Sequence, residues 1–151
     1  MKSKCLIFIA VVFLFSCKNK SHQEAENQPA IQGTWKLISG TINDKKSGRT
    51  TSYPMDFSMI KIINETHFAF LKHNKNPKDS SGFDAGGGTY KLTGNDYTEQ
   101  LQYYKNKNWE GKPFNFKLTL ANDTLTQTGL EQVEKEGIDR VIIEKYVKEG
   151  N

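Results

Sequence analysis

Residues 96–104, DYTEQLQYY, place an acidic side chain among aromatic ones at strand spacing. Alternate side chains of a strand point to opposite faces, so one face carries Tyr97, Glu99, Leu101 and Tyr103. This face is the more apolar one, and we expect it to point inward. A buried carboxylate is costly unless it is paired or hydrogen-bonded. Glu99 is therefore a candidate anchor for a ligand amine or hydroxyl, with Tyr97 and Tyr103 beside it. Alternatively, a neighbouring Tyr or Lys satisfies it, or the two faces are reversed.

Cys17 offers a second kind of chemistry, because it ends an apolar segment in the sequence FLFSCKNK. Residues 5–15 are an unbroken apolar run preceded by Lys2 and Lys4. A membrane-spanning helix needs about 20 apolar residues, so this shorter run indicates a secretory signal. The sequence LFSC resembles the lipobox of bacterial lipoproteins, in which the cysteine thiol is alkylated by diacylglycerol before cleavage. Phe15 departs from the usual small residue of that motif. The alternative is a buried cysteine in an N-terminal helix.

The lipobox resemblance implies an address and a division of the chain. Residues 1–16 would be a lipoprotein signal peptide, and two or more acyl chains on Cys17 would hold the protein stably on a membrane. Lys18 replaces the aspartate that retains such proteins at the inner membrane of some bacteria, so the resemblance implies the outer membrane of a bacterial envelope, in either leaflet. We expect residues 17–30 to be the lipidated cysteine and a flexible polar tether. Residues 31–151 then form one domain.

Charge and cysteine content exclude several classes of function. The chain has 21 Lys and Arg against 17 Asp and Glu, and the two signal lysines reduce the basic count to 19 in the mature chain. This balance gives no argument for nucleic acid as a partner. Cys5 and Cys17 are the only cysteines, so the mature chain has neither a disulfide nor a thiolate metal site. His67 and His73 would lie about 20 Å apart on a strand, too far to share a metal. We expect no metal and no cofactor.

The elements that must position these residues are strands. Eight segments of five to ten residues are rich in Thr, Tyr, Phe and Ile and are bounded by Gly, Asn, Asp or Pro. They cover residues 34–42, 58–63, 66–72, 87–94, 96–104, 113–121, 124–129 and 139–147. No amphipathic helix is expected, although residues 131–137 could form one helical turn. The sequence predicts an all-β domain. Which face of residues 139–147 points inward stays open, because both faces are mixed.

The links between these segments alternate in length. Short links fall around 64–65, at 94–95 and at 122–123, and the last two are two-residue turns that need positive φ. Long links fall at roughly 43–57, 74–86, 105–112 and 131–138. In an up-and-down antiparallel meander, alternate links lie at opposite ends, so all long loops share one end. An eight-stranded meander closes into a barrel that can hold one small ligand. We expect an open mouth rimmed by loops and a closed floor.

A family resemblance appears in the sequence GTWKL. Gly33 and Trp35 look like the Gly-x-Trp motif that opens the first strand of lipocalins, and the resemblance covers residues 31–148. It implies that Trp35 plugs the floor of the barrel beneath a basic residue of the last strand, where Lys145 and Lys148 stand. The stretch GGGTYKLTGNDYTEQLQYY is similar to segments of short lipocalin-like domains in bacterial envelope lipoproteins. Barrels of this kind bind many unrelated ligands, so the resemblance names no ligand.

Two functions from different classes fit these observations. The first is a lipid-anchored barrel that binds a small, largely apolar molecule. The second is a structural or protein-interaction module with a filled barrel, whose loop aromatics Tyr53, Phe83 and Trp109 bind another protein. The same three side chains are candidate ligand contacts at the mouth. An enzyme is a third reading and would use Glu99 in a solvent-reachable cavity with a raised pKa. The sequence contains no nucleophile–base pair, paired-histidine motif or dinucleotide fingerprint.

Overall fold

A computed structural model describes residues 29–150 of the chain, so the predicted signal peptide, Cys17 and most of the tether lie outside the described residues. Nine strands and one short 3₁₀ helix make up this part. The elements are β1 (Gly33–Asp44), β2 (Thr50–Ser52), β3 (Phe57–Ile63), β4 (His67–Asn74), β5 (Asp84–Thr93), β6 (Asp96–Tyr104), β7 (Pro113–Ala121), β8 (Thr124–Val133), η1 (Glu134–Glu136) and β9 (Ile138–Glu149).

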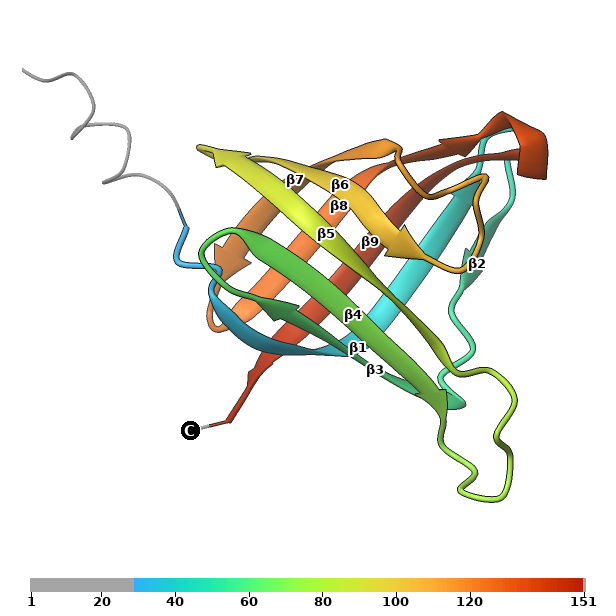
Figure 1. Ribbon diagram of the computed structural model, residues 1–151, viewed down its shortest axis with the longest axis horizontal. Helices are drawn as coiled ribbons and strands as arrows, with labels where there is room; N and C mark the ends of the chain where they lie inside the picture. The colour runs from blue at the N-terminus through green and yellow to red at the C-terminus, as the bar shows by residue number, and fades with distance from the viewer. Residues whose placement is uncertain (1–28, 151) are drawn as a thin grey trace, which may run out of the picture.

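The strands form one closed antiparallel barrel (Figure 1). Each strand from β3 to β9 pairs with the next along the chain, and β1 pairs with both β3 and β9, which closes the sheet. The expectation of an eight-stranded up-and-down barrel is confirmed. The one strand outside this barrel of eight is β2, which is short and pairs only with the far end of β1. Because the sheet closes within residues 29–150, a protein of residues 18–151 contains every strand of the barrel.

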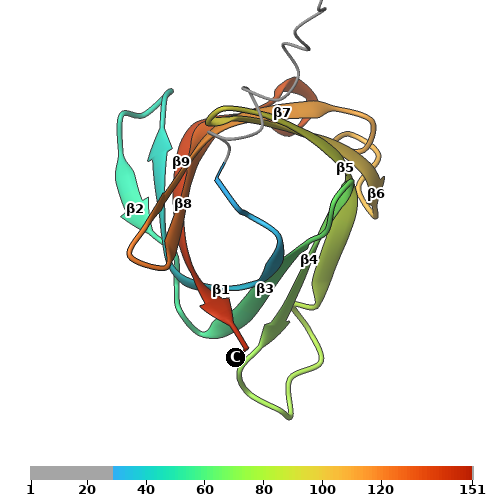
Figure 2. The same ribbon diagram turned by 90° about the vertical axis from the view of Figure 1, so that its left-hand side faces the viewer.

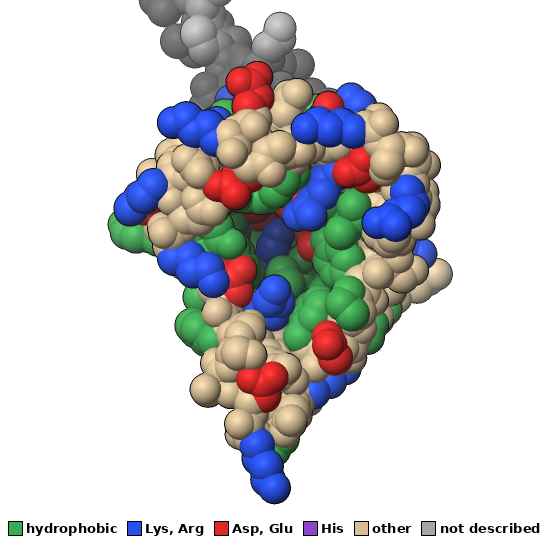
Figure 3. Space-filling model, turned by 90° about the vertical axis from the view of Figure 1, so that its right-hand side faces the viewer, with side chains coloured by type: hydrophobic (Ala, Val, Ile, Leu, Met, Phe, Trp, Pro, Cys, Tyr) green, Lys and Arg blue, Asp and Glu red, His purple; other side chains and the backbone are tan. Residues whose placement is uncertain are grey.

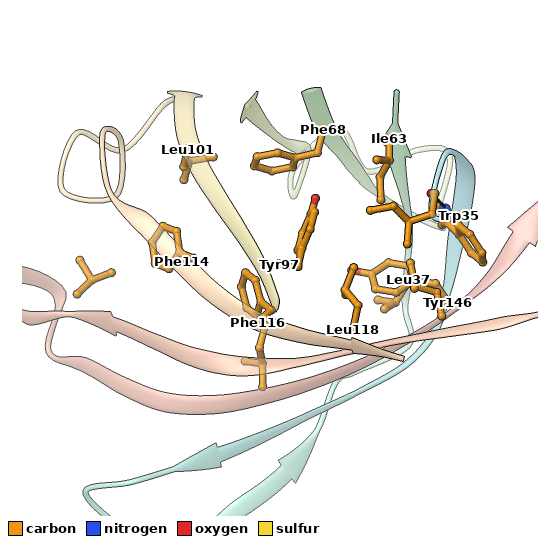
Figure 4. Close-up of a cluster of buried hydrophobic side chains, with 14 residues drawn as sticks. Trp35, Leu37, Ile63, Phe68, Tyr97, Leu101, Phe114, Phe116, Leu118 and Tyr146 are labelled. Carbon is orange, nitrogen blue, oxygen red and sulfur yellow. Dashed lines mark hydrogen bonds between the residues drawn. The ribbon is translucent and has the colours of Figure 1, made fainter. Parts of the chain in front are cut away.

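Alternation of side chains builds the core. In β7, Phe114, Phe116 and Leu118 are buried, while Asn115 and Lys117 between them are exposed. The core also takes side chains from β1, β3, β4, β6, β8 and β9, so it lies inside the barrel (Figure 4). In Figure 4, Leu101 and Phe114 lie at one end of the cluster and Trp35 and Tyr146 at the other.

The tight turns and the long loops lie at opposite ends, as predicted from their lengths. Gly94, Asn122 and Asp123 have φ of 57°, 49° and 60°, the left-handed conformation that two-residue hairpins require. These turns lie at the end of the barrel where the described chain begins (Figure 1). The loops that join β1 to β3, β4 to β5, β6 to β7 and β8 to β9 lie at the other end. The last of these contains η1, a single 3₁₀ turn within the stretch 131–137 where one helical turn was possible.

Trp35 closes the floor. Its side chain is 1% exposed, and its indole Nε1 donates a hydrogen bond of 2.7 Å to the carbonyl oxygen of Ile31. The segment that contains Ile31 crosses the end of the barrel (Figure 2). The Lys148 ammonium lies 5.7 Å from the Trp35 ring, a cation–π contact, so Lys148 rather than Lys145 takes the predicted position. Gly33 has φ of 137°, and a Cβ there would meet the Lys148 side chain at 2.8 Å.

A β-bulge in β6 corrects the predicted inner face of this strand. Tyr97, Glu99 and Leu101 are buried as expected, but Tyr103 is 69% exposed and Tyr104 points inward instead. The register with β5 shifts between Gly87 and Gly88, so one extra β6 residue is accommodated and the alternation reverses beyond it. The prediction that Tyr103 points inward beside Glu99 is wrong for this reason.

Candidate binding cavity

The barrel interior is not filled. A cavity of about 520 Å³ opens at the end with the long loops, where Figure 3 shows a hollow with apolar and charged side chains on its walls. Its apolar lining comes from all sides of the barrel: Ile42, Phe57, Met59, Phe70, Leu101, Tyr104, Trp109, Phe114, Phe116 and Ile142. Drug-sized ligands occupy cavities of about 300–1,000 Å³. The space is therefore large enough for one small molecule.

The structure divides the predicted site residues into two groups. Tyr53, Glu99 and Trp109 line the cavity. Trp109 packs back onto the rim, because its ring stacks on Phe114 with 5.5 Å between the ring centroids. Phe83 is 62% exposed on the loop between β4 and β5 and does not belong to the lining. Tyr103 is also outside, on the far side of β6.

Glu99 has a partner inside the barrel. The Lys61 ammonium donates a hydrogen bond of 2.8 Å to Glu99 Oε1 and another of 2.7 Å to Gln127 Oε1. The exposed fractions of Lys61 and Glu99 are 3% and 7%. The sequence left open whether a neighbouring Tyr or Lys satisfies the Glu99 carboxylate. In this structure, Lys61 does so. Its carboxylate still faces the cavity, because Lys61, Glu99 and Gln127 all line it.

Sequence reasoning missed Lys61. The stretch SMIKII looks like a strand with isoleucines on the inner face, but Ile62 is 40% exposed and Lys61 is buried with Ile63. Four aromatic rings surround the Lys61 ammonium at 5.6–6.0 Å from their centroids, from Phe68, Tyr97, Phe116 and Tyr146. Cation–π attraction adds to the ion pair here. A lone Lys in an apolar run was the only signal in the sequence.

A second acidic centre lies on β9, whose inner face is now defined by Ile142, Glu144 and Tyr146. Glu144 is buried and accepts hydrogen bonds from two phenols: Tyr53 OH at 3.0 Å and Tyr146 OH at 2.7 Å. Burial and the adjacent Glu144 carboxylate raise the pKa of both tyrosines. Both therefore remain neutral donors at ordinary pH.

Arg140 and Glu131 form a third polar pair nearer the mouth. Arg140 Nε donates a hydrogen bond of 2.7 Å to Glu131 Oε2, and a terminal guanidinium nitrogen of Arg140 lies 2.7 Å from the same oxygen in a salt bridge. Burial raises the pKa of Glu131, although Arg140 opposes this. Burial likewise raises the pKa of Glu99 against the opposing effect of Lys61. Desolvation thus outweighs the ion pair at both carboxyls.

The stability of the wild type relative to Glu131→Gln is expected to depend on pH, because of this balance between desolvation and ion pairing. A carboxyl with a raised pKa in the folded state binds its proton more tightly there than in the unfolded chain, whose reference pKa is 4.5. The wild type therefore loses stability relative to the variant as pH rises from about 4.5 through the raised pKa of Glu131. Urea unfolding of both proteins from acid to neutral pH measures the difference. A variant that becomes relatively less stable as pH rises would show that the Arg140 pair dominates.

Tyr97, the remaining predicted ligand contact, does not belong to the cavity lining. Tyr97 is fully buried, and within residues 29–150 its hydroxyl has no hydrogen-bond partner. The lining of the described cavity contains no His, Ser, Thr or Cys. In the described part of the chain, no group of three or more His, Cys, Asp or Glu side chains is placed to hold a metal ion. No helix among residues 29–150 is both long and apolar enough to cross a bilayer.

Comparison with known proteins gives no relative: no model of a protein family matches the chain, and no curated protein matches it.

Proposed function

We propose that this protein is a lipid-anchored envelope lipoprotein whose barrel binds a small, largely apolar molecule. The observation that carries the proposal is the cavity of about 520 Å³ at the loop end. Its walls combine aromatic and aliphatic side chains with eight charged ones, of which Lys61 pairs with Glu99 and Arg140 with Glu131. Small-molecule sites likewise join an apolar lining with a set of fixed polar groups. The cavity supports this reading over the filled-barrel alternative.

Native mass spectrometry tests the proposal on residues 18–151 purified without detergent. We expect the mass spectrum to show a retained small molecule. If the barrel arrives empty, we expect it to take up a neutral apolar probe, N-phenyl-1-naphthylamine, and an increase in probe fluorescence measures this uptake. A chain that arrives empty and does not take up the probe would contradict the proposal.

Met59→Trp is expected to weaken probe binding about tenfold, because a larger side chain in the cavity forces about 1–3 kcal/mol of repacking or displaces the probe. Met59 lines the cavity. Ile38→Trp is the matched control, because Ile38 is 45% exposed on the outer surface of β1. Fluorescence titration of both variants gives the two affinities. Equal affinities would show that the probe binds outside the barrel.

One observation favours a protein contact as a second function. Phe83 is the most exposed apolar side chain of the mouth loops, at 62%. Tyr53 and Trp109 contribute to the cavity instead, so Phe83→Ala alone separates the two functions. Recovery of the same partner proteins by the variant and the wild type would contradict a contact through this loop.

The membrane anchor is proposed from the lipobox resemblance at Cys17. With the lipid on Cys17, the tether of residues 18–30 would have a root-mean-square span of roughly 20 Å. The described chain begins at the floor end of the barrel (Figure 1). The barrel would therefore stand with its floor toward the membrane and its mouth facing away. The outer membrane is the proposed location.

Cys17→Ser is expected to abolish lipidation, since a hydroxyl cannot form the thioether. The variant should keep its signal peptide or appear as a soluble species. Metabolic labelling with a fatty acid and membrane fractionation measure this. A variant that keeps acyl chains and stays in the membrane would contradict the anchor.

A further inference from the structure

Two of the carboxylates inside the barrel pair with a cation, and a third does not. Lys61 pairs with Glu99 at 2.8 Å, and Arg140 pairs with Glu131 at 2.7 Å. Glu144 is buried to a similar degree as Glu99, yet within residues 29–150 it forms no salt bridge with a Lys or Arg. An ionised carboxylate away from water is costly without a cationic partner. Glu144 is therefore the deep group that a ligand would complement.

The contacts of Glu144 leave acceptor capacity for a ligand. Tyr53 and Tyr146 each donate one hydrogen bond, to Oε1 and Oε2 respectively. A carboxylate has about four lone-pair sites, so about two remain. Because the phenols stay neutral, they fix the carboxylate without cancelling its charge. The group is thus held in place and remains an acceptor at the cavity wall.

The overall charge of the lining also favours a cation. Five acidic side chains line the cavity, namely Asp56, Asp84, Glu99, Glu131 and Glu144, against three basic ones, Lys61, Lys72 and Arg140. Asp84 also pairs with Lys105, which lies outside the lining, at 3.2 Å. Lys72 lies over the Phe57 ring, 5.2 Å from its centroid, and is only partly buried. The deep cation, Lys61, already holds two acceptors. An anionic ligand would therefore meet no unpaired cation deep in the cavity.

We infer that the molecule bound in the barrel is an amphipathic amine, whose ammonium group pairs with Glu144 while its apolar body lies against the aromatic wall. The inference rests on the proposed binding function. Ile142 precedes Glu144 by two residues on the inner face of β9 and lines the cavity with it. The Tyr53 ring lies 6.3 Å from the Phe57 ring, so aromatic faces stand beside the carboxylate. Aromatic faces attract an ammonium group as well as an apolar chain.

Three ligands with the same body test the head group: 6-phenylhexylamine, 6-phenylhexan-1-ol and 6-phenylhexanoate. Each ligand is titrated at neutral pH into residues 18–151 loaded with N-phenyl-1-naphthylamine. The displacement of this probe gives the affinity of the ligand. We expect the ammonium form to bind about tenfold or more tightly than the other two, as for one added hydrogen bond between charged groups. This comparison uses the wild type alone, so it does not depend on the folding of any variant.

Glu144→Gln should remove the preference for the amine, which is read as the ratio of the amine and alcohol affinities within the variant. Glu65→Gln is the matched control, because it removes an exposed carboxylate that lies outside the cavity lining. It should keep the preference for the amine. Circular dichroism and thermal unfolding show whether both variants are folded.

The outcomes separate this inference from the proposed function. Equal affinities of the three ligands in a wild type that takes up the neutral probe would overturn the amine and leave the binding function in place. Tighter binding of the carboxylate, or a full amine preference in folded Glu144→Gln, would overturn it as well. A wild type that takes up neither the probe nor any of the three ligands would overturn the binding function itself.

Discussion

Replacing Lys61 with Met is expected to lower the free energy of unfolding by about 3–5 kcal/mol at neutral pH, the usual result of removing one partner of a buried ion pair. Methionine has a similar length and fits among aromatic rings, so the loss comes mainly from charge rather than volume. Glu99 would then be a buried carboxylate without its cation, and Gln127 Oε1 would lose the hydrogen bond it accepts from Lys61. Urea unfolding followed by tryptophan fluorescence measures the change.

The pH dependence of this loss is itself part of the prediction. Lys61 is the main influence that opposes the raised pKa of Glu99, so the pKa should rise further in the variant. A protonated Glu99 needs no cation, and the destabilisation should therefore shrink as pH falls toward about 4.5. A loss that is constant across this range would indicate that Lys61 acts by packing alone.

The double variant Lys61→Met with Glu99→Leu provides the control. Apolar replacements of a whole buried ion pair are often neutral or stabilising, so the double variant should be more stable than Lys61→Met alone. If adding Glu99→Leu lowers stability further, the two side chains do not form the energetic pair that their 2.8 Å contact indicates. The double variant also allows probe binding to be measured without the Lys61–Glu99 pair.

The architecture of the barrel could be predicted because its signals are local. Alternation in β7, the turn sequences at Gly94 and at Asn122–Asp123, and the unequal lengths of the links each depend on neighbouring residues. Together they predicted the strand order and the ends at which turns and loops lie, whereas the floor closed by Trp35 was implied only by the resemblance of Gly33 and Trp35 to the Gly-x-Trp motif. The residue beneath which Trp35 packs remained a choice between Lys145 and Lys148, because one step along a strand changes its face.

The candidate site was less predictable because its groups meet across the barrel. Glu99 was recognised from its own strand, but its partner Lys61 lies 38 residues away in sequence on a strand whose isoleucines hid it. Glu144 was not singled out, because both faces of β9 carry charged and apolar residues. The β6 bulge moved Tyr103 outside, since a shift of one residue reverses every later side chain. No pattern within a single strand contains this information.

Trp35→Ala is expected to destabilise the barrel by about 3–5 kcal/mol, as large-to-small replacements of buried aromatics do. The indole is almost wholly buried, its Nε1 donates to Ile31, and its ring lies beneath Lys148. Its loss would leave a void at the floor and would free the segment that crosses this end of the barrel. Chemical unfolding with a Phe-based or circular dichroism readout measures the change, because the variant loses one of the two tryptophans.

Two aromatic residues at the opposite end serve as controls for Trp35. Phe83→Ala should change stability by no more than about 0.5 kcal/mol, since the ring is mostly exposed. Trp109→Ala should fall between the two, because its ring stacks on Phe114 but is only partly buried. Trp109→Ala should also weaken probe binding, whereas Trp35→Ala should affect affinity only through unfolding, since Trp35 lies outside the cavity lining. Equal losses of stability at Trp35 and Phe83 would contradict a floor closed by Trp35 and, with it, the assignment of the two ends of the barrel.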